Sequence, residues 1–422
     1  METPRSFIHD LIAEVLPEVE TPYSWLYWSL IYSISSSAAN NHYLLSFKGN
    51  FTYYPNVYII LLGESGLGKA FGITLAKKLL TEADITRVIS GRSSIQAIVQ
   101  ELSQTQSAPG KAPITDSRGA IINGELSTAI ISDPDALTIL TDLFDSNDNP
   151  NWTNRLKGDG KEKLKNPYIT CLFGSSPAHF YDKIPQANIE GGYISRNLII
   201  YEEQRSKDVD PLDEEEDDKT DKVDKFISII APKYVPHLRE IAKRVKTRLI
   251  PNEAARKIYN TWRREWRNNQ AIYNDRTGFI NRVPDHVIKV AMCLCLSRYE
   301  FSNIIIESDM LEAIEKVTLL VYASKKTSEG TGIDPLAQAT KRVIDFLISA
   351  ENNEMSRKDL LVAGYGNFDP VSLDRIIDTL MEMKWVKRDR LNLGVSGSDW
   401  LYKLAGEPLE SYKRFKEQRS KK

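Results

Sequence analysis

The segment Gly63-Glu64-Ser65-Gly66-Leu67-Gly68-Lys69 constrains the fold more than any other part of the chain. It follows Val57–Leu62, a continuous apolar run of strand length, and it precedes a predicted helix over Lys69–Leu80. The glycines let consecutive backbone N–H groups converge on phosphate oxygens, and the helix N-terminus adds partial positive charge. Strand, glycine-rich turn and helix in this order predict a P-loop that binds ATP, with Lys69 reaching the β- and γ-phosphates.

Position 70 departs from the usual P-loop pattern. A Ser or Thr hydroxyl normally holds Mg²⁺ there, and the methyl group of Ala70 cannot do so. The alternative interpretation of the whole segment is a structural glycine turn. The strand before the segment and the helix after it favour nucleotide binding, so we expect ATP, together with Mg²⁺, as the ligand.

A second acidic element is expected at the end of a neighbouring strand, and Gly119–Leu126 fits that place. Glu125 is the candidate general base that would polarise the attacking water. Asn123 and Gly124 stand where an Asp usually supports the metal, so we expect no metal site built from protein ligands alone. Phosphates and water would hold Mg²⁺, with Glu125 or Asp116 in support. The alternative is that Glu125 only caps the segment that follows.

Three further candidates come later in the chain. The predicted strand Leu164–Phe173 is followed by Ser175, whose hydroxyl could contact the γ-phosphate; the alternative is an ordinary strand-to-helix turn. Arg196 follows a glycine pair at the start of a strand, where it could act as an arginine finger on the nucleotide of a neighbouring subunit. The alternative is a surface arginine paired with an acid. Arg282 is a candidate for a second sensor arginine that contacts the nucleotide.

A basic hairpin is predicted between Glu125 and Ser175. The segments Trp152–Leu156 and Leu164–Phe173 flank a glycine-containing turn. A positively charged hairpin with aromatic side chains at its base could track the backbone of single-stranded DNA. The alternative is a solvated charged face. The candidate DNA-binding residues are Arg155, Lys157, Lys161, Lys163 and Lys165.

Composition limits the class of protein. A formal net charge of −2 over 422 residues gives no whole-protein reason to bind nucleic acid, so any such binding must come from local clusters. Three cysteines cannot form a disulfide framework, which fits a reducing cytoplasm. No apolar run approaches the roughly 20 residues that span a bilayer, so no membrane segment is expected.

Alternating strands and helices predict an α/β fold with a parallel or mostly parallel sheet covered on both faces. We expect a helical N-terminal segment (1–40), a P-loop core (41–205) and an acidic linker or loop (206–224). A helical domain (225–334), a winged-helix domain (335–405) and a basic tail (406–422) should follow.

The order of these motifs resembles the hexameric AAA+ helicases of the superfamily 3 and MCM type. The stretches that start at Tyr54-Pro55-Asn56-Val57, Gly191-Gly192-Tyr193-Ile194-Ser195-Arg196 and Arg282 also resemble helicase-like ATPases of phage, plasmid and genomic-island replication modules. The resemblance covers roughly Tyr23–Lys326 and implies an AAA+-like core. It further implies four roles: phosphate lysine for Lys69, base for Glu125, sensor for Ser175 or Ser176, and finger for Arg196.

We therefore expect an ATP-dependent replicative DNA helicase of a mobile genetic element, working as a homo-hexameric ring with ATP between subunits. Its partners would be single-stranded or fork DNA and a primase or initiator. Two other functions stay open at this point. One is a helicase loader or initiator that binds duplex DNA through the winged helix without unwinding it. The other is a P-loop scaffold that has lost hydrolysis.

Overall fold

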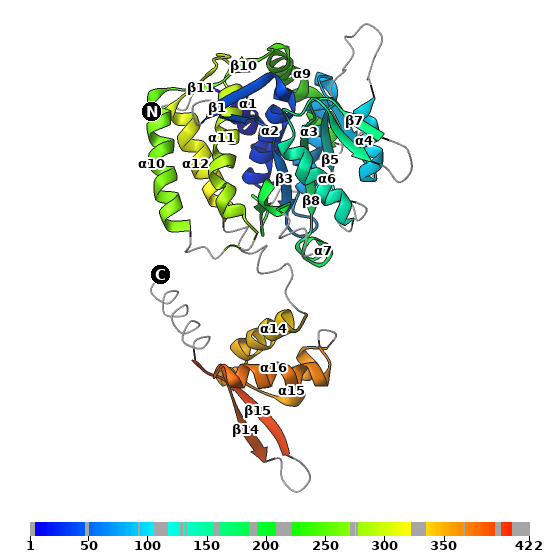
Figure 1. Ribbon diagram of the computed structural model, residues 1–422. Coiled ribbons are helices and arrows are strands. Elements are labelled where there is room, and N and C mark those ends of the chain that lie inside the picture. Colours follow the sequence, from blue (N-terminus) through cyan, green and yellow to red (C-terminus); the bar gives the residue numbers. More distant parts are fainter. Residues whose placement is uncertain are drawn as a thin grey trace. The chain divides into compact units, whose positions relative to one another are not determined.

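The computed structural model describes residues 5–46, 50–91, 93–104, 117–126, 130, 133–155, 161–184, 192–207, 222–270, 275, 277–321, 335–365, 368–392 and 398–406. The chain divides into two compact units, Met1–Thr331 and Gly332–Lys422 (Figure 1). The expected N-terminal segment, P-loop core and helical domain all fall within the first unit. The expected winged-helix domain and basic tail fall within the second.

A five-stranded, all-parallel sheet lies at the centre of the first unit, with the strand order β4-β5-β8-β3-β9. The parallel sheet predicted from the sequence is therefore confirmed. In the register of β3, Tyr58 lies beside Cys171 of β8 on one side and Asn197 of β9 on the other. The strands are β3 (Tyr58–Leu62), β4 (Arg87–Ser90), β5 (Arg118–Asn123), β8 (Tyr168–Ser175) and β9 (Asn197–Tyr201).

Helices cover both faces of this sheet, and the side chains of β3 alternate between two cores. Ile59 and Leu61 belong to one hydrophobic cluster, and Ile60 and Leu62 belong to the other. This double burial explains why the strand is a continuous apolar run. The first face carries α2 (Tyr23–Ala38), α3 (Lys69–Ala83) and α9 (Lys222–Lys243), and the second carries α4 (Ile95–Ser103), α6 (Pro134–Asp145) and α7 (Pro177–Lys183).

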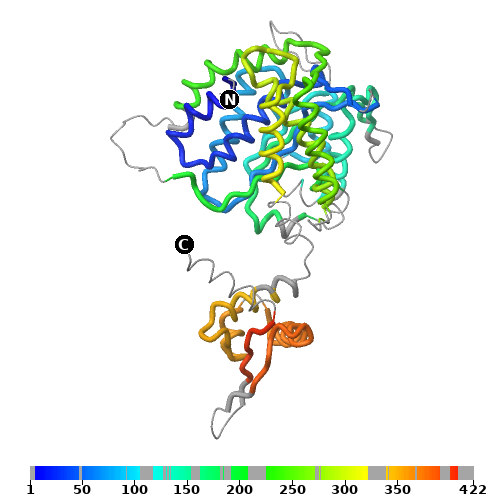
Figure 2. The backbone as a smooth tube through the Cα atoms, turned by 90° about the vertical axis from the view of Figure 1, so that its left-hand side faces the viewer, coloured from blue at the N-terminus to red at the C-terminus, as the bar shows by residue number. Residues whose placement is uncertain are grey.

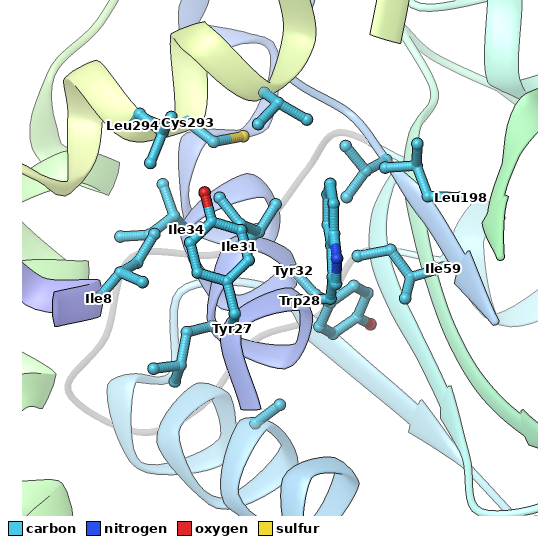
Figure 3. Close-up of a cluster of buried hydrophobic side chains, with 14 of the residues drawn as sticks. Ile8, Tyr27, Trp28, Ile31, Tyr32, Ile34, Ile59, Leu198, Cys293 and Leu294 are labelled. Carbon is cyan, nitrogen blue, oxygen red and sulfur yellow. The ribbon is translucent and has the colours of Figure 1, made fainter. Parts of the chain in front are cut away.

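Helix α2 is buried almost all round, as expected for a helix with apolar residues on every side. Figure 3 shows Trp28 facing Ile59 and Leu198 of the sheet, while Tyr27 lies on the other side of the helix near Ile8. The hydroxyl of Ser29 has no hydrogen-bond partner among the described residues, whereas the other four buried serines of α2 are paired. Two donate to carbonyls one turn back, one bonds to the backbone at Pro55, and one pairs with a threonine of β8.

The N-terminal helices and the helices after residue 222 are not separate from the sheet. They share one hydrophobic cluster with it, and both tube and ribbon views show them side by side (Figures 1 and 2). The boundaries expected at residues 40 and 205 are therefore not boundaries between compact units. The remaining elements of this unit are α1 (Phe7–Val15), η1 (Leu16–Glu18), η2 (Ala39–Asn41), β1 (His42–Ser46), β2 (Phe51–Tyr53), β6 (Trp152–Arg155), β7 (Lys161–Leu164), η4 (Ile194–Arg196), β10 (Thr247–Arg248), β11 (Ile250–Pro251), α10 (Glu253–Asn269), α11 (Phe279–Ser297), β12 (Ile304–Ile305) and α12 (Glu307–Leu319).

The second unit packs helices on a three-stranded antiparallel sheet of order β13-β15-β14. Its core is apolar and its largest buried aromatic is Tyr402. The sequence predicted the three helices but not β13, because a three-residue strand carries too little pattern. The expected hairpin of Trp385–Arg388 with Leu391–Leu393 is wrong: Arg388 and Leu391 both lie in β14, which pairs with β15 instead. The elements are α14 (Pro335–Ser349), η6 (Glu351–Asn353), β13 (Glu354–Ser356), α15 (Arg357–Ala363), α16 (Pro370–Glu382), β14 (Val386–Asn392) and β15 (Ser398–Leu404).

Two predicted segments lie largely outside the described residues: the acidic stretch at 208–221 and the basic tail at 407–422. Helix α9 begins at Lys222, directly after the acidic stretch. Within the described ranges, no helix is both long enough and apolar enough to cross a membrane.

Two buried histidines tie helices of the first unit together. Nε2 of His237 bonds to the carbonyl of Leu296 at 3.0 Å, and Nε2 of His286 bonds to the carbonyl of Ser195 at 2.9 Å. In both rings Nδ1 has no hydrogen-bond partner among the described residues. Protonation would bury a second, unpaired N–H with a positive charge. Burial accordingly lowers the pKa of His237 to about 4 and that of His286 to about 3.

We predict that acid destabilises the first unit before most carboxylates titrate. Unfolded histidine takes up a proton below about pH 6.5, whereas these two stay neutral in the folded chain, so each subtracts about 1.4 kcal/mol per pH unit below that point. Thermal unfolding followed from pH 7.5 to 5 should show a falling Tm, and the fall should be shallower in His286→Asn. A Tm that is flat over this range in the wild type would contradict the prediction.

Candidate functional site

The glycine-rich turn Gly63–Gly68, the predicted P-loop, joins β3 to α3 and depends on three glycines. Gly66 and Gly68 have φ of 88° and 90°, a region that side chains disfavour. At Gly63 a Cβ would lie 2.7 Å from the carbonyl oxygen of Glu202 and 2.8 Å from the ring of Trp25. The glycine spacing read from the sequence is thus a steric requirement of this turn.

Lys69 is the first residue of α3 and turns back over the loop. Its Nζ donates to the carbonyl oxygens of Gly63 and Glu64, the second at 2.7 Å, and lies 5.5 Å from the centroid of the Trp25 ring. Burial lowers the pKa of Lys69, and the carboxylates of Glu64 and Glu125 offset part of that shift. The predicted phosphate lysine is therefore at the mouth of the loop and close to the predicted base.

The N-terminal segment supports the P-loop from beneath. The hydroxyl of Thr21 donates to the carbonyl of Gly68 at 2.9 Å, and the indole N–H of Trp25 donates to the carbonyl of Ile200 at 3.2 Å. Neither Thr21 nor Trp25 was predicted from the sequence. No local pattern could have found them, because they precede the loop by about forty residues and act only through the tertiary fold.

A cleft of about 530 Å³ opens above the P-loop. The segments that line it follow three neighbouring parallel strands, β3, β5 and β8. Because α3 and α7 continue on opposite faces of the sheet, the cleft lies at the switch point where open α/β sheets bind ligands. Its lining residues are Ser65, Gly66, Gly68, Lys69, Ala70, Gly124, Glu125, Ser175, Ser176 and His179.

The structure therefore brings together Lys69, Glu125 and Ser175, which the sequence placed far apart. Ser175 ends β8, and its hydroxyl donates to the carbonyl of Ser176 at 3.2 Å. His179, in the first turn of α7, also faces the cleft and was not singled out as a site residue. The sequence did contain a signal for His179. Ser176-Pro177 predicts the start of a helix directly after a strand, and a side chain in the first turn of such a helix lies beside the strand end.

The loop that carries Glu125 is fixed against the end of β8. The N–H of Leu126 donates to the carbonyl of Gly174 at 2.6 Å. A Cβ on Gly174 would approach the carbonyl oxygen of Gly124 to 2.3 Å, whereas a Cβ on Gly124 meets nothing within 4 Å. The side chain of Asn123 points toward β4 instead, accepting from the N–H of Gly91 at 2.8 Å. It does not serve the cleft.

Protein ligands for a metal ion are sparse in this cleft. Ala70 is exposed and offers a methyl group, and no group of three His, Cys, Asp or Glu residues suited to a metal occurs in the described part of the chain. Asp116 lies outside the described residues. Mg²⁺ keeps several waters and binds substrate phosphates readily. The residues present therefore fit a Mg²⁺ that arrives with a triphosphate, with the Glu125 carboxylate nearby.

The two predicted arginines lie at the amino edge of the sheet, where the parallel strands begin, whereas the cleft lies at the carboxyl edge, where they end. Arg196 directly precedes β9, whose first residue pairs with the first residue of β3, while the P-loop follows the last residue of β3. Arg196 and Arg282 both bond to Oδ2 of Asp145, at 2.5 Å and 3.3 Å for their closest atoms. Arg282 is therefore not brought to the P-loop of this chain. The acid pairing considered for Arg196 is present, and its partner Asp145 was not predicted.

The basic hairpin is present as β6 paired antiparallel with β7, so its second strand is Lys161–Leu164. The predicted second strand, Leu164–Phe173, is wrong, because Tyr168–Phe173 belongs to β8 of the central sheet. In the sequence the hairpin comes between α6 and β8. Its base therefore lies beside the first residues of β8, at the amino edge of the sheet, which is also the edge of Arg196. Lys163 and Lys165 are exposed. Lys157 lies outside the described residues, as do the side chains of Arg155 and Lys161. The hairpin base is anchored by Trp152, whose indole N–H donates to Asp142.

Comparison with known proteins finds no family model that matches the chain and no curated relative with significant sequence similarity. The resemblance to hexameric helicases thus depends on the motif residues and their order. The geometry of the cleft stands independently of that resemblance.

We predict that the same substitution destabilises the protein at Gly174 but not at Gly124, two glycines that lie close together in the fold. Gly174→Ala should force the Glu125 loop away from β8, because its Cβ overlaps the carbonyl of Gly124, at a cost of about 1–3 kcal/mol. Gly124→Ala adds the same methyl group where there is open space and should leave stability nearly unchanged. Chemical denaturation of both variants measures the difference. Equal stabilities would contradict the described approach of the two loops.

Proposed function

We propose that the chain is a P-loop ATPase that hydrolyses ATP in the cleft at the carboxyl edge of its sheet. One observation carries the proposal: Lys69, Glu125 and Ser175 reach the same cleft from the ends of three adjacent strands. A lysine at a glycine loop, a carboxylate and a hydroxyl are the groups that phosphoryl transfer to water uses.

In this proposal the P-loop N–H groups and Lys69 hold the β- and γ-phosphates. Glu125 accepts a hydrogen bond from a water whose oxygen attacks the γ-phosphorus. The bond between that phosphorus and the β–γ bridging oxygen breaks, the electron pair stays on ADP, and the proton of the water passes to Glu125 and then to phosphate. Mg²⁺ bound with the triphosphate would neutralise charge on the phosphates. The hydroxyl of Ser175 donates a hydrogen bond to the γ-phosphate.

We further propose that hydrolysis drives movement on single-stranded DNA in a ring of copies, as in the helicases that the motifs resemble. The placement of Arg196 and of the basic hairpin supports this. Both are at the amino edge of the sheet, opposite the P-loop, where a second copy could reach them. In a ring with the nucleotide between subunits, the P-loop edge of one subunit would bind the nucleotide and the arginine edge of the next subunit would face it.

The second unit has the element order of a winged helix, namely three helices with a strand between the first two and a terminal hairpin. The exposed face of α16 is acidic, with Asp374, Asp378 and Glu382 beside Arg375. Asp374 is paired with Arg357 at 2.9 Å, and Lys384, Lys387 and Arg388 are exposed just after the helix. The loader or initiator that binds duplex DNA through this unit therefore stays an alternative.

A scaffold that binds ATP without hydrolysing it is the second candidate function. The exposed methyl of Ala70 and the missing carboxylate at Gly124 favour it, because both weaken the metal site. Tight ATP binding without phosphate release, with or without DNA, would support this candidate over the ATPase.

We predict Mg²⁺-dependent ATP hydrolysis that single-stranded DNA stimulates. Lys69→Ala removes the phosphate lysine and should reduce kcat/KM about 100-fold or more. Lys77→Ala, an exposed lysine on the same helix, is the matched control and should match the wild type. Steady-state phosphate release with and without DNA measures both. If Lys69→Ala hydrolyses ATP at the wild-type rate, the activity does not come from this cleft.

The hairpin has its own test. Lys163→Glu combined with Lys165→Glu reverses two exposed charges of the hairpin and should abolish DNA stimulation while leaving DNA-free hydrolysis intact, because both lie at the edge remote from the P-loop. Lys233→Glu, exposed on α9, serves as the control. Unchanged DNA stimulation in the double variant would show that these hairpin lysines do not contact the DNA.

A further inference from the structure

Helix α10 (Glu253–Asn269) carries a concentration of positive charge that has no part in the proposed hydrolysis of ATP. Five of its seventeen residues are basic and two are acidic. Residues 243–269 as a whole contain nine Lys or Arg against two Asp or Glu, whereas the complete chain has a formal net charge of −2. The surplus of cations is therefore local, as expected for a surface that binds a polyanion.

The inner face of α10 is packed against α11. The indole N–H of Trp266 donates to the carbonyl of Ile280 at 3.1 Å, and the hydroxyl of Tyr259 donates to the carbonyl of Pro284 at 3.2 Å. Trp262 stacks on Trp266, with the ring centroids 5.6 Å apart. The aromatic side chains of α10 therefore anchor the helix, and its opposite face is left to polar residues.

The basic side chains lie together on that outer face. At 3.6 residues per turn, four cationic positions fall within an arc of about 100°, and Asn260 lies on the same arc. Glu253 is the acid at the start of the arc, and Glu265 lies to one side of it. The four cations are exposed, and they are Arg256, Lys257, Arg264 and Arg267.

Within the described part of the chain, none of these four cations forms an ion pair. Arg264 donates through Nε to the carbonyl of Asn260 in its own helix, at 3.2 Å. By contrast, Arg205 and Arg357 each pair with a carboxylate. Since a guanidinium has five N–H donors, most donors on the outer face of α10 are available to a ligand.

The chemistry of this face fits a phosphate backbone better than a membrane or a protein. Its neutral residues, such as Asn260, Thr261 and Asn268, are also of the types that donate hydrogen bonds to phosphate oxygens. None of the large hydrophobic side chains exposed in the described ranges belongs to α10. A membrane-binding helix inserts an apolar face, and a protein partner needs an apolar interface core, so α10 offers neither.

The outer face also fits a duplex better than a single strand. Proteins that bind single strands without sequence preference stack the bases on aromatic side chains, and the aromatic side chains of α10 face inward. From Arg256 to Arg267 the helix rises roughly 16 Å, a length over which duplex DNA presents about ten phosphate charges. Figure 1 shows α10 on the opposite side of the first unit from the hairpin strand β7.

We propose that the outer face of α10 binds the phosphate backbone of duplex DNA without sequence preference, through Arg256, Lys257, Arg264 and Arg267. This surface is distinct from the hairpin proposed for single-stranded DNA. It goes beyond the proposed ATPase, because its binding needs no nucleotide. The first unit then has two DNA contacts on opposite sides, a duplex at α10 and a single strand at the hairpin.

Fluorescence anisotropy of a labelled duplex, with the full chain and without nucleotide, tests this surface. Arg256→Gln combined with Arg264→Gln removes two phosphate contacts. The affinity should fall at least about tenfold, equally for duplexes of unrelated sequence, and the slope of log Kd against log salt concentration should become shallower by about two. Arg256→Lys combined with Arg264→Lys keeps both charges and should stay within about threefold of the wild type.

The matched control removes the same charge elsewhere in the first unit. Lys77→Gln combined with Lys233→Gln changes two exposed lysines and should bind the duplex as the wild type does. Thermal unfolding of the glutamine variant of α10 should give the wild-type Tm, because both arginines are exposed and lack ion pairs among the described residues.

Equal duplex affinity of the glutamine variant of α10 and the wild type would overturn the proposal. Loss of binding in Lys384→Gln combined with Lys387→Gln, but not in the α10 variant, would place the duplex on the second unit instead. Binding of the wild type to vesicles of anionic lipid but not to the duplex would identify a membrane surface and also overturn it. A wild type that binds duplex through α10 but hydrolyses no ATP is a different result, since only the proposed ATPase then fails.

Discussion

The packing of α2 on the central strand is the contact on which the rest of this structure depends. At the amino end of β3, the hydroxyl of Ser35 donates to the carbonyl of Pro55 at 2.7 Å and accepts from the N–H of Val57 at 3.2 Å. At the carboxyl end, the Trp25 ring lies directly beneath Gly63. One buried helix thus contacts both ends of β3. It therefore positions both the P-loop at the carboxyl end of the strand and the segment with Arg196 near its amino end.

The sequence predicted the parts of the site that are local. The glycine spacing, Lys69, Glu125 and the strand ending in Ser175 all follow from short patterns, because the chemistry of a phosphate loop needs consecutive residues. Partners across the fold were not predictable in this way. Trp25 and Asp145 meet the P-loop and the arginines only through packing, so no periodicity or spacing marks them. The position of Arg282 at the far edge was missed for the same reason.

The Pro-Asn-Val stretch that helped to carry the family resemblance has a structural role here. Asn56 is buried; its Nδ2 donates to the carbonyl of Phe144 at 2.9 Å and its Oδ1 accepts from Lys289 at 2.5 Å. Burial lowers the pKa of Lys289 to about 8 despite the carboxylates of Asp145 and Asp285. These residues link α6, α11 and the start of β3. They therefore hold in place the helix ends that carry Asp145 and Arg282, rather than contacting nucleotide.

The proposed function requires that the cleft at the carboxyl edge binds a nucleoside triphosphate through the P-loop. Equilibrium titration of the wild type with a fluorescent ATP analogue, followed by competition with unlabelled ATP, tests it most directly. The account predicts saturable binding of one nucleotide per chain, displaced by ATP and lost in Gly68→Val, whose side chain would overlap Thr21 and cannot adopt the φ of that turn. Absence of saturable binding by the wild type, or full binding by Gly68→Val, would contradict the account.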